Sequence, residues 1–172
     1  LRQRIADIRQ LTRGHGLQSR YAMKACPATR IVREMLANDI WIDAVSGNEV
    51  LRALKAGYRR GMTPPQVLFT ADAFRDGALD ICLKNRIMPN IGSAGMIGLL
   101  ANAGYKGPIG IRVNPGFGHG HVNACDTGGP SSKHGIWYHD LKTVARDAAR
   151  RGLKMVLLHA HIGSGPKPEE LL

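Results

Sequence analysis

Short apolar runs alternate along the chain with longer stretches in which apolar residues recur every three or four positions. The short runs predict strands and the longer stretches predict amphipathic helices. The predicted strands are Ser19–Cys26, Trp41–Ser46, Gln66–Thr70, Ile87–Gly92, Ile109–Asn114 and Met155–Ile162. The predicted helices are Leu1–Leu11, a segment through Ile31 and Leu36, Asn48–Ala56, Asp72–Asn85, Met96–Ala103 and Leu141–Arg151. This alternation of about six strands with helices is typical of βα units around a parallel sheet.

Glycine follows three of the predicted helices, at Gly57, Gly104 and Gly152. A left-handed residue at the end of a helix favours glycine, because glycine has no Cβ to clash with the backbone. The three positions therefore support the predicted helix ends.

Two features favour a (β/α)8 barrel over an open doubly wound sheet. Within Ile109–Asn114 and within Met155–Ile162, polar residues such as Arg112 and His161 alternate with large aliphatic residues, so they share one face of each strand. Barrel enzymes build their sites from such residues at the carboxyl ends of strands. The first strand also ends in Ala-Met-Lys-Ala-Cys-Pro, without the glycine-rich turn of a dinucleotide-binding sheet. The sequence thus predicts an α/β fold, a partial barrel of about six βα units.

Lys24 lies in an apolar stretch and is predicted to face the same side as Ala22. A buried ammonium group is costly to desolvate, so such a lysine is paired or partly neutral. A neutral amine attacks carbonyl groups, and small Ala22 leaves room for a cofactor ring. The alternative is a lysine that forms an ion pair with Asp43 on the neighbouring strand. Both interpretations fit the spacing.

The sixth strand ends in His-Ala-His-Ile-Gly-Ser-Gly. The imidazole of His161 can stack on a planar cofactor, and the glycines around Ser164 leave backbone N–H groups available for an anion. The alternative for either histidine is a hydrogen-bonded position in the core, and we favour it for His159.

The loop from Asn114 to Gly135 is too long for a plain connection, and loops of this length commonly form lids or binding loops. His119, His121 and Cys125 could ligate zinc, but a fourth ligand is missing from the pattern. We therefore favour a glycine-hinged substrate lid that carries the candidate residues His119, His121, Lys133 and His134. The alternative for Lys133 and His134 is an exposed pair without a role in the site.

The composition is that of a globular protein: of 172 residues, 44% are hydrophobic and 22% charged. The net charge of +11 attracts anions, but the basic residues are scattered and no nucleic-acid module is recognisable, so nucleic-acid binding is disfavoured. No apolar run is long enough to cross a bilayer. Three widely spaced cysteines argue against a disulfide framework, and they favour a cytoplasmic protein.

Five sequence blocks occur in an order that resembles a known family. The blocks are Tyr21-Ala-Met-Lys-Ala, Asp43-Ala-Val-Ser-Gly-Asn-Glu49, Arg112-Val-Asn-Pro-Gly-Phe-Gly-His-Gly-His, Thr127-Gly-Gly-Pro-Ser-Ser-Lys-His-Gly-Ile and His161-Ile-Gly-Ser-Gly. Together they resemble the diaminopimelate decarboxylases, pyridoxal-phosphate enzymes with an alanine-racemase-like barrel. The Asn-Pro-Gly and Ser-Lys-His-Gly blocks argue against an ornithine decarboxylase.

The resemblance implies roles for individual residues. Lys24 would be bonded to pyridoxal 5'-phosphate, and His161 would stack on its pyridine ring. The other implied cofactor residues are Asp43, Glu49 and Arg112 around the lysine and ring, with Gly163 and Ser164 at the phosphate. No metal is implied.

The resemblance also implies a reaction and an organisation. The reaction would be decarboxylation of meso-2,6-diaminopimelate to L-lysine, in a complete enzyme that is a homodimer. Residues 1–172 would form an incomplete cofactor-binding barrel domain, without the last strands and the second, β-rich domain of the family. The alternatives are a pyridoxal-phosphate-binding barrel without turnover and a related basic amino-acid decarboxylase.

Overall fold

The computed structural model describes residues 1–119 and 127–163. The chain divides into two compact units. The first unit comprises Leu1–Phe69 and Arg75–Met88, and the second comprises Thr70–Phe74 and the chain from Pro89 onward.

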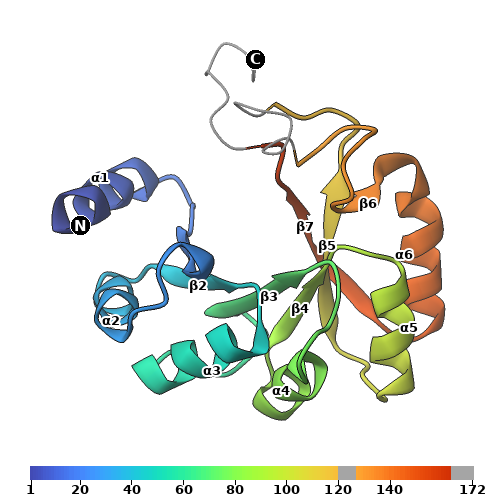
Figure 1. Cartoon of the computed structure of the whole chain (residues 1–172), viewed down its shortest axis with the longest axis horizontal. Helices are drawn as coiled ribbons and strands as arrows, with labels where there is room; N and C mark the ends of the chain where they lie inside the picture. Colours follow the sequence, from blue (N-terminus) through green and yellow to red (C-terminus); the bar gives the residue numbers. More distant parts are fainter. Residues whose placement is uncertain (120–126, 164–172) are drawn as a thin grey trace. The chain divides into compact units, whose positions relative to one another are not determined.

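The first unit is built on parallel strands. β1 (Arg20–Ala22) pairs with β2 (Trp41–Ala44), and β2 pairs with β3 (Val67–Ala71), whose last two residues belong to the second unit. The helices of this unit are α1 (Arg2–Thr12), α2 (Thr29–Ala37), α3 (Gly47–Ala56) and α4 (Ala78–Asn85). α3 packs against both α2 and α4, so the helices form a layer along these strands (Figure 1).

Burial follows the sequence pattern in the first unit. The buried aliphatic and aromatic side chains lie on the inner faces of the helices and on the strands, and they include Val32, Ile42, Val50, Val67 and Phe69. A smaller cluster of Ile5, Met35 and Ile40 holds α1 against α2. The amphipathic periodicity thus places apolar stripes where the predicted helices need them.

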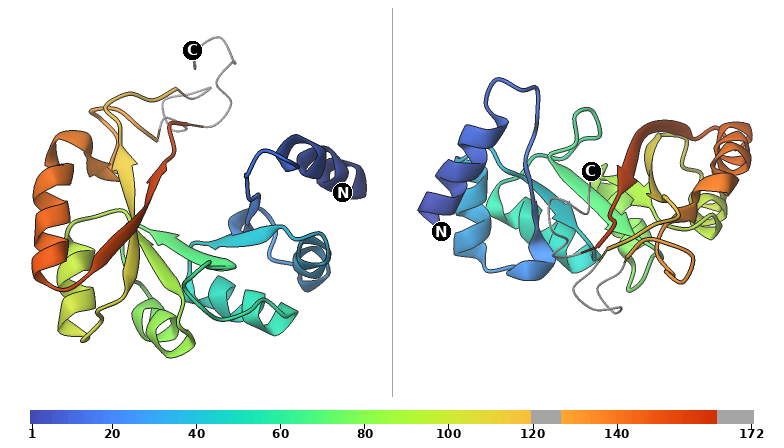
Figure 2. Two further views of the ribbon diagram at one scale, coloured as in Figure 1. Left: turned by 180° about the vertical axis from the view of Figure 1, so that it is seen from behind. Right: turned by 90° about the horizontal axis from the view of Figure 1, so that it is seen from above.

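The second unit is centred on β5 (Pro108–Asn114). This strand pairs in parallel with β4 (Met88–Ile91), with the short β6 (Ile136–Trp137) and with β7 (Lys154–Ala160). Two helices, α5 (Gly95–Asn102) and α6 (Leu141–Arg150), lie next to each other along one side of β5 (Figures 1 and 2). All these pairings are parallel, which confirms the predicted α/β fold with alternating strands and helices.

The predicted helix ends are confirmed. Gly57 caps α3 in the left-handed conformation, with φ of 114°. Gly104 and Gly152, which follow the ends of α5 and α6, have φ of 74° and 79°. Residues other than glycine rarely adopt these φ angles, so the backbone at these three helix ends requires glycine.

Two predicted element boundaries are wrong, and one strand was not predicted. The first strand ends at Ala22 instead of Cys26, and residues Met23–Ala25 form a single 3-10 turn. The helix predicted from Asp72 begins only at Ala78, because Asp76 and Gly77 have positive φ and cannot belong to an α-helix. β6 was not predicted, so the described residues hold seven strands instead of about six.

β7 leaves three large apolar side chains exposed. The exposed fractions are 42% for Met155, 51% for Val156 and 64% for Leu158. Exposed apolar patches of this kind favour association with other chains. We expect the 172-residue chain to associate as its concentration rises, and the double variant Val156→Ser/Leu158→Ser to associate less. Sedimentation velocity measures this, and a wild-type chain that stays monomeric at every concentration would contradict the prediction.

In the described residues, no helix is both long and apolar enough to span a bilayer. Cys26 and Cys82 are free thiols, and burial raises the pKa of the Cys82 thiol to about 12. Cys125 lies outside the described residues.

Candidate functional site

Lys24 lies at the carboxyl end of β1, in the first unit, and its side chain is exposed. The prediction of a desolvated lysine is therefore wrong. A 3-10 turn has three residues per turn, so it does not continue the two-residue alternation of the strand. Met23 takes the inward position and is fully buried, while Lys24 is left accessible. The geometry gives an accessible primary amine one turn beyond a parallel strand.

Asp43 lies close to this position through the strand register. Ala22, two residues before Lys24, is paired with Asp43 on β2. Asp43 is half-buried, and its negative charge partly offsets the burial that lowers the pKa of Arg20. An amine just beyond the carboxyl end of β1 and a carboxylate near the carboxyl end of β2 thus belong to neighbouring βα units.

Glu49 has a local role in the same unit. Its Oε2 accepts a hydrogen bond from the Val45 N–H at 2.9 Å, and its own N–H donates to Ser46 Oγ at 3.2 Å. This pair of contacts closes the amino end of α3, much as a capping box does. The cofactor role implied for Glu49 stays a prediction.

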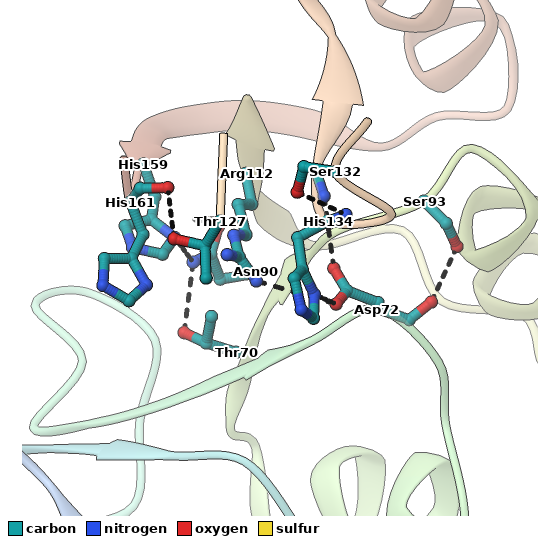
Figure 3. A network of polar contacts seen from close by, with 11 residues as sticks. Thr70, Asp72, Asn90, Ser93, Arg112, Thr127, Ser132, His134, His159 and His161 are labelled. Carbon is teal, nitrogen blue, oxygen red and sulfur yellow. Dashed lines mark hydrogen bonds and ion pairs between the residues drawn. The ribbon is translucent and has the colours of Figure 1, made fainter. Parts of the chain in front are cut away.

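A network of polar side chains occupies the second unit (Figure 3). Asp72, which follows β3, lies at its centre. Its carboxylate contacts His134 Nδ1, lies 3.6 Å from Arg112 Nη1, and accepts the Gly135 N–H at 3.4 Å. Arg112 on β5 has only 10% of its side chain exposed. A buried guanidinium group is therefore held beside a carboxylate at the carboxyl end of β5.

A deeper layer of the network joins three strands. Asn90 on β4 is fully buried, and its Nδ2 donates to Thr70 Oγ1 at 3.1 Å and contacts His159 Nδ1 at 3.0 Å. His159 accepts at Nδ1, which leaves its own proton on Nε2. Burial, assisted by the charge of Arg112, lowers the pKa of His159 to about 4. His159 is thus a neutral, hydrogen-bonded histidine, as the sequence predicted, but it is half-buried and not a fully buried core residue.

This pKa predicts a pH dependence of stability. Between pH about 6.5 and about 4 the unfolded chain binds a proton at His159 and the folded chain does not, so stability is lost as pH falls through this window. With partial exposure allowed for, the loss is on the order of 1–2 kcal/mol. We expect His159→Gln to flatten this slope in urea unfolding between pH 4 and 7. The exposed His15→Gln is the control, and an unchanged slope in His159→Gln would contradict the prediction.

The long loop is attached to the ends of β5 and β7 by hydrogen bonds of side chains and backbone. Asn114 holds Gly129 through two hydrogen bonds of 2.9 Å, one to its carbonyl and one from its N–H. The His161 carbonyl accepts from Thr127 Oγ1 at 3.0 Å, and the Ile162 carbonyl accepts from the His119 N–H at 2.8 Å. These contacts fix the backbone of His161, whose side chain is half-buried.

The structure brings some of the predicted site residues together. Arg112 and His134 meet at Asp72, and Lys24 follows β1, the strand that pairs with the strand of Asp43. Lys133 and His119 are exposed. Gly163 has φ of 149°. His121 and Ser164 lie outside the described residues. The described residues hold no group of three potential metal ligands, and the zinc alternative rests on His121 and Cys125, which lie outside them.

Sequence reasoning missed Asp72 and Asn90. The predicted helix begins at Asp72, which lies two residues after the predicted strand Gln66–Thr70, close to the kind of position from which the other candidates come. Asn90 is a polar residue within the otherwise apolar strand β4, which was the available signal.

Each unit therefore carries polar and charged side chains at the carboxyl ends of its parallel strands. This placement is typical of βα proteins that bind small molecules at the carboxyl ends of their strands. Residues 1–171 match the pyridoxal-binding domain of the pyridoxal-dependent decarboxylases, and the chain belongs to this family.

The curated proteins most similar in sequence include diaminopimelate decarboxylases. The chain is 44% identical to diaminopimelate decarboxylase of Streptomyces coelicolor over 85% of its length, and 39% identical to that of Escherichia coli K12 over 96%. It spans 33% and 38% of the length of these two relatives.

Solved structures agree with the sequence relatives. A crystal structure of diaminopimelate decarboxylase, 39% identical, matches 91% of the chain with a TM-score of 0.80, and the chain covers 38% of it. A mutant of the Helicobacter pylori enzyme complexed with L-lysine, 27% identical, matches 92% with the same TM-score, and the chain covers 41% of it. The chain thus has the fold of a partial pyridoxal-binding barrel.

The donor set fits pyridoxal phosphate chemically. The cofactor carries an aldehyde, a phosphate and an aromatic ring. Lys24 offers an accessible amine for the aldehyde, and Gly163 offers a backbone without a Cβ for the phosphate. Half-buried His161 offers an imidazole for the aromatic ring, and buried Arg112 adds a positive charge.

Proposed function

We propose that the protein containing this chain decarboxylates meso-2,6-diaminopimelate to L-lysine with pyridoxal 5'-phosphate. The observation that carries the proposal is an accessible lysine one turn beyond β1, in a chain that matches a pyridoxal-binding domain over residues 1–171. The names of the relatives and the L-lysine in the Helicobacter pylori structure support this substrate and product.

The residues of the chain take separate roles in this proposal. When bound, the cofactor supplies a conjugated ring that withdraws the electron pair left on the α-carbon as carbon dioxide departs. Lys24 would hold the cofactor through its ε-amine. His161 stacks on the ring and fixes its plane. Arg112 presents a positive charge, and Gly163 and Ser164 bind the phosphate.

The remaining residues act around this group. Asp43 balances the charge of the lysine, and Glu49 fixes the turn that leads into α3. The lid residues His119, His121, Lys133 and His134 exclude water and contact the distal end of the substrate. In this proposal the chain is the barrel part of a cytoplasmic homodimeric enzyme of lysine biosynthesis.

Product analysis tests the proposal. The protein is incubated with pyridoxal phosphate and meso-diaminopimelate, and L-lysine and carbon dioxide are measured, with L-ornithine and L-arginine as competing substrates. We expect equal amounts of lysine and carbon dioxide from diaminopimelate and much slower release from the other two. Preferential turnover of ornithine or arginine would contradict diaminopimelate as the substrate and indicate a related amino-acid decarboxylase. Cofactor binding without turnover of any of the three amino acids would indicate a cofactor-binding protein without this activity.

A further inference from the structure

Asp72 is fixed from both its backbone and its side chain. Its carbonyl accepts from Ser93 Oγ at 2.9 Å, and the preceding Ala71 carbonyl accepts from the Gly92 N–H at 2.8 Å. A Cβ at position 92 would lie 1.9 Å from Asp72 Oδ1. The carboxylate therefore occupies space that only a glycine leaves free.

The two side chains that meet this carboxylate come from different parts of the chain. Arg112 lies on β5, whereas His134 lies in the segment Ser132–Gly135, at the end of the long loop (Figure 3). Both contact the same oxygen, Oδ2, while the Gly135 N–H donates to Oδ1. One carboxylate thus holds a buried arginine and a loop segment at the same time.

The partial burial of Asp72 and its partners strengthens the electrostatic contacts that link Arg112 to the loop segment. Arg112 is 10% exposed, and Asp72 and His134 are each 31% exposed, so solvent screens these contacts less than it screens a surface pair. If the loop segment moves away, Asp72 loses two of the three groups that fix its carboxylate, and the orientation it gives to Arg112 loosens.

We propose that Asp72 is a positioning residue that couples the orientation of Arg112 to the docking of the Ser132–Gly135 segment. His134 is the anchor on the loop side of this coupling. The effect on the cofactor rests on the proposed function, because Arg112 is a cofactor residue only there. The docking of the segment stands on the contacts alone.

The first test follows docking without any cofactor. Lys133 is exposed beside His134, so tryptic cleavage after Lys133 reports release of the segment. Cleavage after the exposed Lys55 in α3 serves as the internal reference for loss of the fold. Asp72→Asn keeps an oxygen for the Gly135 N–H and removes the charge, and His134→Gln removes the imidazole. We expect each to raise the ratio of cleavage at Lys133 to cleavage at Lys55 by roughly 5-fold or more, because opening then costs less.

The second test follows the affinity for pyridoxal phosphate in the same variants. We expect Asp72→Asn and His134→Gln each to weaken binding by roughly 5- to 50-fold, because contacts that fix a charged group are lost. The double variant is expected to be no weaker than the weaker single variant, since both act through one carboxylate. Asp76→Asn, an exposed aspartate four residues along the chain, is the matched control and is expected to leave both readouts unchanged.

The outcomes separate the coupling from the proposed function. Unchanged cleavage at Lys133 in both variants would overturn the docking role. Faster cleavage in His134→Gln with unchanged cofactor affinity would overturn the coupling, as would additive losses in the double variant. A wild-type protein that binds no pyridoxal phosphate would overturn the proposed function and the coupling to the cofactor, while the cleavage ratio would still decide the docking role.

Discussion

Replacement of Lys24 by alanine is expected to abolish decarboxylation, with kcat lower by at least about 10³-fold. The variant loses the only group that the proposed function assigns to holding the cofactor covalently. Lys24 is exposed and lies on a turn whose buried anchor is Met23, so the substitution leaves the packing of the first unit intact. Steady-state kinetics, together with the absorbance of bound cofactor, measure the loss.

The control for this variant is Lys55→Ala. Lys55 is another exposed lysine of the first unit, near the end of α3, and its removal changes the net charge equally. We expect Lys55→Ala to keep wild-type turnover and Lys24→Ala to keep the wild-type unfolding temperature. Wild-type turnover in Lys24→Ala would contradict the assignment.

Replacement of His161 by alanine is expected to lower kcat by roughly 10- to 10³-fold, if its imidazole orients the cofactor ring. The backbone of His161 is held by Thr127, and its side chain is half-buried after the end of β7. The loss of the ring therefore removes a planar surface without releasing the strand. Stopped-flow measurement of turnover and the absorbance of bound cofactor report the effect.

The control is His15→Ala, which removes an exposed histidine that no proposal uses. We expect it to match wild type in turnover and in cofactor absorbance. If His161→Ala also turned over at the wild-type rate with unaltered cofactor absorbance, the stacking role would be excluded.

Elements with strong local signals were predicted well. The strand predicted at Ile109–Asn114 is β5, Pro108–Asn114, and the helix predicted at Asn48–Ala56 is α3, Gly47–Ala56. Both have regular periodicity, and α3 has a capping residue, Ser46, and a terminal glycine. In these segments local preference and tertiary packing favour the same structure.

The errors arose where a local pattern continued past a backbone change. The apolar stretch around Lys24 continues the pattern of β1, yet the chain turns at Met23, so a lysine predicted to be desolvated is exposed. The segment from Asp72 has helix-forming residues, but the Asp76-Gly77 pair is a turn signal, and both residues have positive φ. Greater weight on that dipeptide would have moved the start of α4 and left Asp72 among the candidate site residues.

The contact between Asp72 and His134 was beyond prediction from the sequence. The two residues are 62 positions apart, and no periodicity links them. The sequence identified His134 as a lid candidate, but its partner depends on how the loop returns to the end of β5. Contacts of this kind are set by tertiary structure, whereas helices and strands are marked locally.

The most direct measurement of the central claim is the location of the bound cofactor. The protein is incubated with pyridoxal phosphate, reduced with borohydride and digested with trypsin, and the labelled peptide is sequenced by mass spectrometry. We expect label on Lys24, in a peptide from Tyr21 to Arg30, because trypsin does not cleave after a modified lysine. Label on another lysine, with Lys24 unmodified, would contradict the account.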